Sequence, residues 1–298
     1  MKILITGSNG LLGQKIVAQL EKAGKKYLAT SLGPNRNPDC PEEHYRPLDI
    51  TSFNEVNDMI KVEKIDVVIN TAAMTNVDAC EEEEVKCRKI NVKGVQNLYS
   101  ACEENNAFLV HVSTDFVFDG ENGPYKEEDI RNPLSIYATS KRDSEDILMD
   151  GSYKEWSILR TIIVFGQGNN LSRSNIVLWA KDALASGKEL TIVDDQFRAP
   201  TWADDLAWAC IKAGEMRAKG VFHISGPETI SIYELVCRIA DYHGFDKSVV
   251  KPISSSTLNQ KAKRPPRTGF DLTKSRSILG YNPLTLEQSL AELEKEEL

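Results

Sequence analysis

Short apolar runs alternate with longer amphipathic segments through the first half of the sequence. The apolar runs predict strands at residues 2–6, 27–30, 45–48, 66–70, 108–112 and 157–161. The segments between them place apolar residues about every 3.6 positions and predict helices at residues 11–22, 52–61, 82–103 and 136–149. We expect the Ser52 hydroxyl to cap the second helix. This alternation favours right-handed crossovers, and therefore an α/β Rossmann fold: a doubly wound parallel sheet covered on both faces.

The pattern changes after about residue 165. The rest of the chain predicts helices at residues 175–186, 202–216, 232–242 and 284–293, and strands at residues 191–193 and 221–224. Residues 251–270 are rich in Pro, Ser, Lys and Arg and predict a loop. We therefore expect a Rossmann domain at residues 1–165 and a smaller C-terminal α/β lobe at residues 166–298. Part of residues 190–215 is expected to return to the first domain.

The charge balance argues against two broad classes of partner. The 298 residues include 44 acidic and 36 basic side chains, giving a formal net charge of −8. Nucleic acids and anionic membranes attract proteins with a basic face, so the sequence favours neither. No apolar run approaches the ~20 residues that cross a bilayer. The apolar stretch at residues 3–6 is too short for a secretory signal, so we expect a cytoplasmic protein.

Neither the cysteines nor the histidines suggest a metal site. Thiolate–zinc sites use closely spaced cysteine pairs, and this sequence has no Cys-x-x-Cys. We expect reduced, partly buried thiols at Cys40, Cys80, Cys87, Cys102, Cys210 and Cys237. The four histidines are isolated, and His111, inside an apolar run, is expected to be a core residue with its hydrogen bonds satisfied.

A glycine-rich turn, GSNGLLG at residues 7–13, joins the first predicted strand to the first predicted helix. Glycines at Gly7, Gly10 and Gly13 permit a sharp chain reversal and let a pyrophosphate approach the backbone. The free N–H groups and the positive end of the helix dipole then attract phosphate. This context predicts a dinucleotide site that includes Asn9; the alternative is a tight turn without a ligand.

The end of the second predicted strand bears on which dinucleotide binds. An acidic residue there would hydrogen-bond the adenosine ribose and repel a 2′-phosphate. This sequence instead has TSLGPNR at residues 30–36, with Ser31 and Arg36. A guanidinium pairs well with phosphate, so we expect NADP(H), with NAD(H) as the alternative. Alternatively, Arg36 is simply solvated.

Tyr137 and Lys141 form a Tyr-x-x-x-Lys pair at the start of a predicted helix. Residues spaced i and i+4 project from one helix face. A neighbouring ammonium is expected to lower the pKa of a tyrosine, whose ordinary value is near ~10. Thr114, at the end of the fifth predicted strand, could hold a substrate carbonyl against the phenol. These three residues predict a site that protonates an oxygen while hydride reaches its carbon.

These motifs together resemble the extended short-chain dehydrogenase/reductase family. The matching stretches are TGSNGLLG (residues 6–13), NTAAMTNVD (70–78), VSTDFVFDG (112–120), YATSK (137–141) and LRTIIVFG (159–166). Within that family the chain is most similar to the dTDP-4-dehydrorhamnose reductases. That narrower similarity rests on VSTDFVFDG, VDDQFRAPTWADDLA (193–207) and KRPPRTGFDLTK (263–274), so it spans both halves of the chain.

The resemblance implies roles for individual residues. Those implied or expected to contact the dinucleotide are Gly7, Asn9, Gly10, Leu11, Leu12 and Gly13 near the pyrophosphate, Ser31, Arg36, Asp49 and Ile50 near the adenosine, Ala72, Ala73 and Met74 along the cofactor, and Tyr137 and Lys141 at the nicotinamide ribose. Thr114, Tyr137 and Lys141 would be catalytic, with Tyr137 the proton donor. Residues implied to contact a nucleotide sugar, partly from the lobe, are Thr114, Asp115, Gln196 and Arg264.

Two positions bear on the reaction and the sugar. Sugar-nucleotide 4,6-dehydratases carry Thr-Asp-Glu where this chain has Phe116 after Thr114-Asp115, so simple reduction is favoured over elimination. The rhamnose reductases are expected to have a sugar-contacting tryptophan where this chain has Ile163. An aliphatic side chain cannot stack on a sugar in the same way, so the identity of the sugar stays open. A basic cluster, Lys261, Lys263, Arg264 and Arg267, is interpreted as a clamp on the substrate diphosphate or as a solvated loop.

Three functions follow as hypotheses. The first is NADPH-dependent reduction of the 4-keto group of a 6-deoxy sugar linked to a nucleotide. The second is a cofactor-binding regulatory subunit without catalysis, since the β subunit of methionine adenosyltransferase is similar to the same family. The third is a sugar-nucleotide epimerase that uses bound NAD(H). We also expect a homodimer that pairs through helices near residues 84–104 and 136–149.

Overall fold

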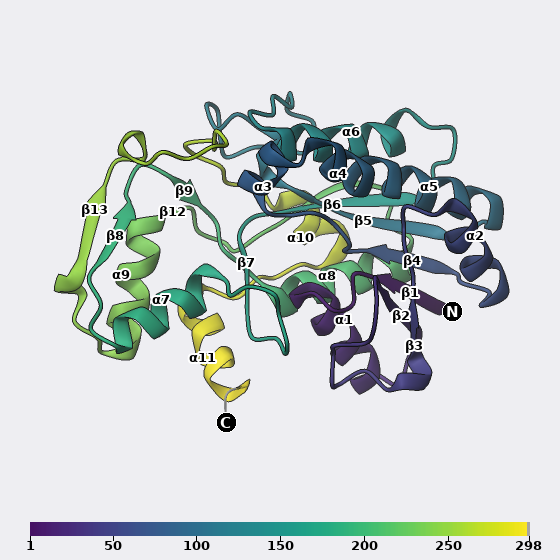
Figure 1. Cartoon of the computed structure of the whole chain (residues 1–298), viewed down its shortest axis with the longest axis horizontal. Helices are drawn as coiled ribbons and strands as arrows, with labels where there is room; N and C mark the ends of the chain where they lie inside the picture. Colours follow the sequence, from purple (N-terminus) through teal and green to yellow (C-terminus); the bar gives the residue numbers. More distant parts are fainter. Residues whose placement is uncertain (297–298) are drawn as a thin grey trace.

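A seven-stranded parallel sheet forms the centre of the molecule (Figure 1). The structure is a computed structural model that describes residues 1–296. The strands of this sheet are β1 (Lys2–Thr6), β2 (Lys26–Ser31), β3 (Tyr45–Pro47), β4 (Val67–Asn70), β5 (Phe108–Thr114), β6 (Trp156–Thr161) and β11 (Gly220–Ile224). Their order is β11-β6-β5-β4-β1-β2-β3, with every neighbouring pair parallel. The predicted doubly wound Rossmann-type fold is confirmed.

Helices cover both faces of this sheet. Helices α1 (Leu11–Lys22) and α8 (Ala203–Met216) lie on one face, and α2 (Phe53–Val62), α5 (Gly94–Asn105) and α6 (Ile136–Asp150) lie on the other. The pleat of β1 shows why: Ile3 and Ile5 are buried in the core with α1 and α8, whereas Leu4 between them is buried with α2, α5 and α6.

The helix predicted at residues 82–103 begins earlier and is interrupted. Helix α3 (Val77–Glu82) is followed by α4 (Glu84–Arg88), a π-helical turn (Lys89–Lys93) and α5. The π turn carries Asn91, whose side-chain Oδ1 accepts from Met74 N at 2.8 Å and whose Nδ2 donates to Met74 O at 3.0 Å. The prediction was wrong because apolar spacing does not register this local contact with a distant loop.

The capping predicted for Ser52 was also wrong. Ser52 directly precedes α2, but its side chain accepts no capping hydrogen bond from the helix. The carboxylate of Asp49 instead accepts from Thr51 N at 2.9 Å, and Ser52 N donates to the backbone oxygen of Asp49 at 3.0 Å. The chain therefore turns into the helix through Asp49.

The second half of the chain contributes to the large sheet and also builds a smaller core. Its remaining elements are β7 (Val164–Phe165), α7 (Ile176–Ala185), β8 (Leu190–Val193), β9 (Phe197–Arg198), β10 (Thr201–Trp202), β12 (Ile230–Ser231), α9 (Ile232–His243), β13 (Val250–Ile253), α10 (Thr273–Leu279) and α11 (Leu286–Glu296). Three strand pairs join them: β8 with β13, β7 with β10, and β9 with β12. Apolar residues of α7, α9, α11, β8 and β13 form the smaller core.

Several features of this half differ from the prediction, including the short strands β7, β9, β10 and β12, which were not predicted. The stretch predicted as a loop from residue 251 contains most of β13, which pairs with β8 over four residues. Helix α10 was not predicted, because its seven residues carry a short and weak apolar pattern. Strand β11 extends the large sheet beside β6, and α8 packs on that sheet, so the second half shares its core. The division into two domains at residue 165 stays a prediction.

The described residues also bear on membranes and metals. None of the helices within residues 1–296 combines the length and apolar character needed to cross a bilayer. The same residues contain no cluster of three or more His, Cys, Asp or Glu side chains that could hold a metal ion. The six cysteines are not paired in disulfides.

Candidate functional site

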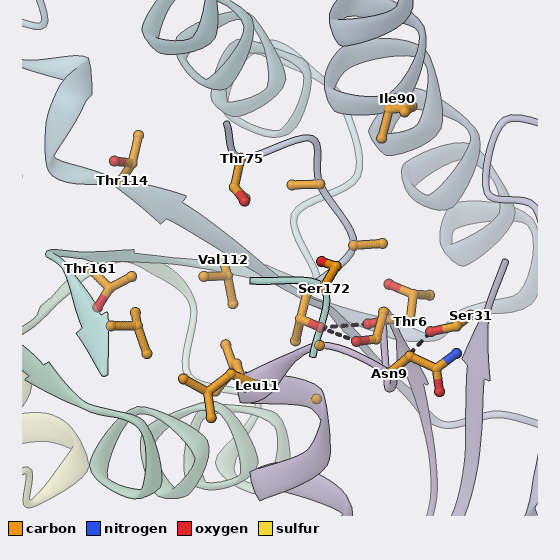
Figure 2. Close-up of a pocket in the computed structure, with 18 of the residues that line it drawn as sticks. Thr6, Asn9, Leu11, Ser31, Thr75, Ile90, Val112, Thr114, Thr161 and Ser172 are labelled. Atoms are coloured by element: carbon orange, nitrogen blue, oxygen red, sulfur yellow. Dashed lines mark hydrogen bonds between the residues drawn. The ribbon is translucent and has the colours of Figure 1, made fainter. Parts of the chain in front are cut away.

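A cleft of about 960 Å³ opens at the carboxyl ends of the parallel strands. Four strands end on a residue with a hydroxyl group that lines it: Thr6 of β1, Ser31 of β2, Thr114 of β5 and Thr161 of β6 (Figure 2). In a doubly wound sheet, the crevice beyond these ends, where the strand order reverses, is the place at which ligands bind.

The glycine turn forms the floor of the cleft. Gly7 has a φ of 74°, and a Cβ there would lie 2.8 Å from the backbone nitrogen of Ala72. At Gly13 a Cβ would approach Gly7 O to 2.4 Å, so the start of α1 packs directly on the turn. At Gly10 a Cβ would meet only Gly7 O, at 3.4 Å. A side chain at Gly10 would otherwise point into open space, so its absence leaves room for a ligand.

The start of α1 is suited to an anion. Gly10 precedes the helix, no side chain caps it, and its first turn holds no acidic residue. The first N–H groups and the positive end of the helix dipole are therefore available to a phosphate. The local structure thus fits the pyrophosphate of a dinucleotide.

The loop after β2 folds against this turn. The backbone N of Asn9 donates to Ser31 Oγ at 3.0 Å, and its side-chain Oδ1 accepts from Arg36 N at 2.8 Å. Ser31 and Arg36 line the cleft together with Asp49 and Ile50, which follow β3. No carboxylate follows the end of β2 through Arg36, so this end of the cleft presents a hydroxyl and a guanidinium.

Tyr137 lies in the first turn of α6. The Ser135 side chain caps this helix by accepting from Ala138 N at 3.2 Å, which fixes where the helix begins. The ring of Tyr137 packs with buried Cys80 and Cys87, and Phe116 meets it edge-on at 6.2 Å. Burial raises the pKa of Tyr137, and a hydrogen bond with the Thr114 hydroxyl opposes that shift. The expected lowering was wrong, because burial outweighs nearby charge and holds the phenol protonated.

Lys141 lines the cleft one turn further along α6. Its Nζ donates to the backbone oxygen of Val112 at 2.8 Å and lies 3.2 Å from His111 Nε2. Burial lowers the pKa of Lys141 to about 8. The hydrogen bond to Val112 therefore holds the ammonium beside strand β5.

A buried hydrogen-bond network behind Lys141 fixes the state of His111. Asn70 Oδ1 accepts from Ala72 N at 3.2 Å, so the Asn70 amide donates through Nδ2 to His111 Nδ1 at 3.0 Å. The proton of the neutral imidazole is then on Nε2, which lies 3.0 Å from Ser144 Oγ. The prediction that His111 is a satisfied core residue agrees with these contacts, and it also touches Lys141.

Thr114 and Asp115 connect the cleft to the second half of the chain. Thr114 Oγ1 donates to Asp115 Oδ1 at 3.1 Å and accepts from Phe116 N at 3.2 Å. The other oxygen of Asp115 accepts from the Thr268 hydroxyl and lies 3.7 Å from Arg198 Nε. Burial raises the pKa of Asp115, although Arg198 opposes this shift. One oxygen of the Asp115 carboxylate, Oδ2, therefore already has its partners in the second half of the chain.

Comparison with known proteins matches the RmlD substrate-binding domain over residues 1–298. The chain belongs to the RmlD substrate-binding domain family. It is 34% identical to a dTDP-4-dehydrorhamnose reductase of Aggregatibacter actinomycetemcomitans, over 97% of each chain. It is 29% identical to the bovine methionine adenosyltransferase 2 subunit beta, over 93% of this chain and 82% of that one.

Solved structures agree with this membership. A dTDP-4-dehydrorhamnose reductase of Clostridium acetobutylicum has a TM-score of 0.88 at 33% identity, covering 100% of this chain and 99% of that one. A Bacillus anthracis dTDP-4-dehydrorhamnose reductase in complex with NADP has a TM-score of 0.85 at 26% identity, with 99% of each chain covered. The resemblance to the extended short-chain dehydrogenase/reductases is thereby confirmed, and with it the class of NAD(P)-dependent oxidoreductases.

The structure brings most of the predicted site residues into this one cleft. Those that line it are Gly7, Asn9, Gly10, Leu11, Leu12, Gly13, Ser31, Arg36, Asp49, Ile50, Ala72, Ala73, Thr114, Asp115, Tyr137, Lys141 and Arg264. Met74 and Gln196 are outside this lining. Met74 is turned toward Asn91 and packs beside Tyr137, and Gln196 is buried next to Gln260. Their predicted ligand contacts stay untested.

The basic cluster is mostly tied to the protein itself. Arg264 donates to Asp78 Oδ2 at 2.7 Å, and Lys261 forms an ion pair with Glu82. The guanidinium of Arg267 lies 4.8 Å from the centre of the Phe197 ring. Arg264 alone of the four basic residues lines the cleft, so the four do not form a joint clamp there.

Sequence reasoning missed several residues of the lining. Thr75, Ile90, Leu171, Arg173 and Asn175 belong to it. Thr75 lies inside the NTAAMTNVD stretch but was not singled out, and Ile90 lies in the π-helical turn, which was not predicted. Asn175 also carried a sequence signal, because an asparagine ahead of an apolar helix is a common N-cap. In the structure its side-chain Oδ1 accepts from Leu178 N at 3.2 Å. Ile163, singled out for the sugar, lines the cleft with a φ of 34°, a strained conformation for a β-branched residue.

Proposed function

We propose that this protein uses NADPH to reduce the 4-keto group of a 6-deoxy sugar linked to a nucleoside diphosphate. The observation that carries the proposal is a shared cleft: Thr114, Tyr137 and Lys141 line the same cavity as the glycine turn. A dinucleotide on the turn and a keto sugar near Tyr137 could therefore meet in it. Relatives at about a third identity named dTDP-4-dehydrorhamnose reductase support the sugar class.

The chain's own residues would supply a proton and hold the carbonyl. When bound, NADPH provides the hydride that reaches the keto carbon. Tyr137, kept protonated by burial, donates its proton to the keto oxygen, so that the carbonyl becomes a hydroxyl. Thr114 and Lys141 line the same cleft, where the Thr114 hydroxyl would turn from Asp115 to share that oxygen and the Lys141 ammonium would hold a ribose hydroxyl. Proton and hydride together balance the reduction.

Reduction without elimination is favoured by the residues around Tyr137. The position after Asp115 is Phe116, whose ring packs edge-on against Tyr137. The carboxylate of Asp115 is bonded to Thr268 and faces Arg198. A free second carboxylate, which removal of water from the sugar would need, is absent from the described lining of the cleft near Tyr137.

Two observations support NADPH over NADH. Arg36 lines the end of the cleft beside the glycine turn, and the Asn9 side chain holds its backbone there. The nearby Asp39 is outside the lining, so a 2′-phosphate would meet a guanidinium and no carboxylate on this loop. NADH is the alternative.

The deciding experiment is an NADPH oxidation assay with the purified chain and a panel of nucleotide-linked 4-keto-6-deoxy sugars. Loss of absorbance at the nicotinamide band, in proportion to hydroxyl sugar formed, is the expected result. Retention of activity with NADPH and a raised KM with NADH would support the cofactor preference. No oxidation with any sugar of the panel would contradict the proposal.

A second candidate is a regulatory subunit without catalysis. The observation that favours it is the similarity to methionine adenosyltransferase 2 subunit beta over 93% of this chain. It predicts stable co-purification with a larger enzyme and no NADPH oxidation with any keto sugar. The presence of Thr114, Tyr137 and Lys141 in one cleft favours the reductase. An epimerase would instead interconvert sugar isomers without net oxidation of added NADPH.

We further propose that the C-terminal lobe takes part in substrate binding. We also propose that the chain forms a homodimer. Helices α5 and α6 are neighbours on one face of the sheet, where a two-fold contact could form. Light scattering on the purified chain should give twice the chain mass. A monomer at micromolar concentration would contradict the dimer, but it would leave the reaction proposal unchanged.

A further inference from the structure

Two arginines in or near the cleft already have an acidic partner. Arg264 is paired with Asp78 at 2.7 Å, and Arg198 lies 3.7 Å from Asp115. Two guanidiniums in the lining differ: within residues 1–296, neither Arg36 nor Arg173 forms an ion pair. Together with the Lys141 ammonium, these guanidiniums give the cleft positive charges without a paired carboxylate, which favour anionic groups on its ligands.

These two arginines come from different loops around the cleft. Arg36 follows β2 beside the glycine turn. Arg173 belongs to the loop between β7 and α7, and it donates to Thr75 Oγ1 at 2.6 Å, in the loop after β4. Figure 2 shows Thr75 and Ser172 of these two loops among the lining side chains. The positive charge of Arg173 also opposes the rise in the pKa of Tyr137, so the two groups interact electrostatically.

The guanidinium of Arg173 has unused hydrogen-bond donors in the described structure. Arginine carries five N–H donors. In the part of the chain that the structure describes, Arg173 uses its guanidinium for a single hydrogen bond, to Thr75. That bond orients the group across the cleft, while the remaining donors stay available for bidentate contact with a phosphate. The start of α7 also lines the cleft next to Arg173, and its dipole adds to the attraction for an anion.

The phosphates of the two ligands can be matched to these charges. The glycine turn suits the pyrophosphate of the cofactor, and Arg36 suits a 2′-phosphate. The anion left without a partner is the diphosphate of the sugar nucleotide, which lies across the sugar ring from the keto group that meets Tyr137. We propose that Arg173 binds the diphosphate of the nucleotide-sugar substrate. This inference rests on the proposed function and names a specific binding residue for it.

The test measures binding without turnover. Isothermal titration calorimetry compares thymidine, uridine, guanosine and cytidine 5′-diphosphates, and the best binder is compared with its monophosphate. We expect Arg173→Met to weaken the diphosphate by roughly tenfold to a hundredfold and to abolish its advantage over the monophosphate. Arg173→Lys should retain part of the affinity, because it keeps the charge and loses the bidentate geometry. NADPH affinity should stay unchanged in both variants.

Matched variants make the outcome specific. Arg276→Met removes an exposed arginine of α10 that does not line the cleft, and it should leave nucleoside diphosphate affinity unchanged. Arg36→Met should weaken NADPH and spare the diphosphate. An unchanged diphosphate affinity in Arg173→Met, a loss of NADPH affinity in that variant, or no diphosphate binding by the natural chain would each overturn the inference. Failure of the proposed function is a separate result: diphosphate binding without oxidation of NADPH by any keto sugar.

Discussion

At the residue scale, burial governs the chemistry of the site. Tyr137 and Lys141 lie one helical turn apart, and both are largely buried in the folded chain. Burial disfavours the charged form of each group, so it raises the pKa of the phenol and lowers the pKa of the ammonium. The phenol is thereby kept as an acid, which is the role that carbonyl reduction needs.

Replacing Tyr137 tests that acid directly. Tyr137→Phe removes the hydroxyl and keeps the ring that packs beside Phe116. We expect kcat to fall by roughly 10²- to 10⁴-fold, the usual contribution of a general acid, while the Kd for NADPH changes little. Stopped-flow oxidation and fluorescence titration of NADPH measure the two quantities. Full activity in this variant would show that another group donates the proton.

The pKa of Lys141 predicts a pH dependence. Burial lowers this pKa to about 8, so the ammonium is present below pH 8 and is lost as the pH rises through it. If the ammonium holds the cofactor ribose, kcat/KM for NADPH should fall about tenfold per pH unit above that value. Lys141→Arg keeps its charge to a much higher pH, so its profile should stay level there. A level profile for the natural chain up to pH 9.5 would contradict this role.

At the element scale, local backbone features place the side chains. The Ser135 cap starts α6 one residue ahead of Tyr137, so the tyrosine enters the cleft from the first turn. The π-helical turn lets Asn91 bind both backbone polar groups of Met74 and fixes the loop after β4. Helix α8 shows a similar connection, since Asp205 near its start accepts from Leu284 N at 2.9 Å.

Asp205 predicts a pH-dependent stability. Burial raises its pKa from 3.8 to about 6, so between these values the folded chain binds more protons than the unfolded chain. Its contribution to the free energy of unfolding therefore falls as the pH rises through that window. Asp205→Asn keeps an acceptor for Leu284 N without the charge. It should stabilise the fold by about 1–2 kcal/mol at pH 7.5, allowing for solvent screening, and be neutral near pH 4.

Urea unfolding at the two pH values measures this effect. The neighbouring residue provides a control, because Asp204 pairs with Lys15 at 3.2 Å. Asp204→Asn should cost up to about 1 kcal/mol at pH 7.5, the opposite direction. Equal unfolding free energies for Asp205→Asn and the natural chain at pH 7.5 would refute the prediction.

At the scale of the whole molecule, a buried polar contact joins the two halves of the chain. Asp115, directly after β5, meets Arg198 of β9 and the hydroxyl of Thr268. Arg198 also donates to the backbone oxygens of Pro265 and Pro266 at 2.6 and 3.3 Å. These bonds hold the loop before α10 against the reaction end of the cleft.

Removing Arg198 should destabilise the whole molecule. Arg198→Met leaves the carboxylate of Asp115 buried and without its cation, which typically costs about 3–5 kcal/mol. The double variant Arg198→Met with Asp115→Asn should lose less than the sum of the single losses, because no buried charge is left unpaired. Chemical unfolding gives all three values, and Arg46→Met, on an exposed arginine, serves as the control. Additive losses would show that the two residues act independently.

The sequence by itself determined the features that depend on short-range patterns. Apolar periodicity located the strands of the large sheet and most helices, because it follows directly from which face of each element is buried. The glycine turn and the spacing of Tyr137 and Lys141 were also readable, since neighbours in sequence are neighbours on a helix. These local signals were enough to predict the large sheet and to mark the glycine turn, Tyr137 and Lys141, whereas the family resemblance supplied many of the other predicted residues of the cleft.

Only the tertiary structure decided which charges are free and which are neutralised. Arg264, expected at the substrate, is paired with Asp78, which is 186 positions away in the sequence. Arg173, which no motif marked, reaches Thr75 across 98 positions. Lys141 is beside His111 for the same reason: packing brings a helix onto a strand. Contacts between distant segments leave no local pattern, so the electrostatics of the cleft emerge when the chain has folded.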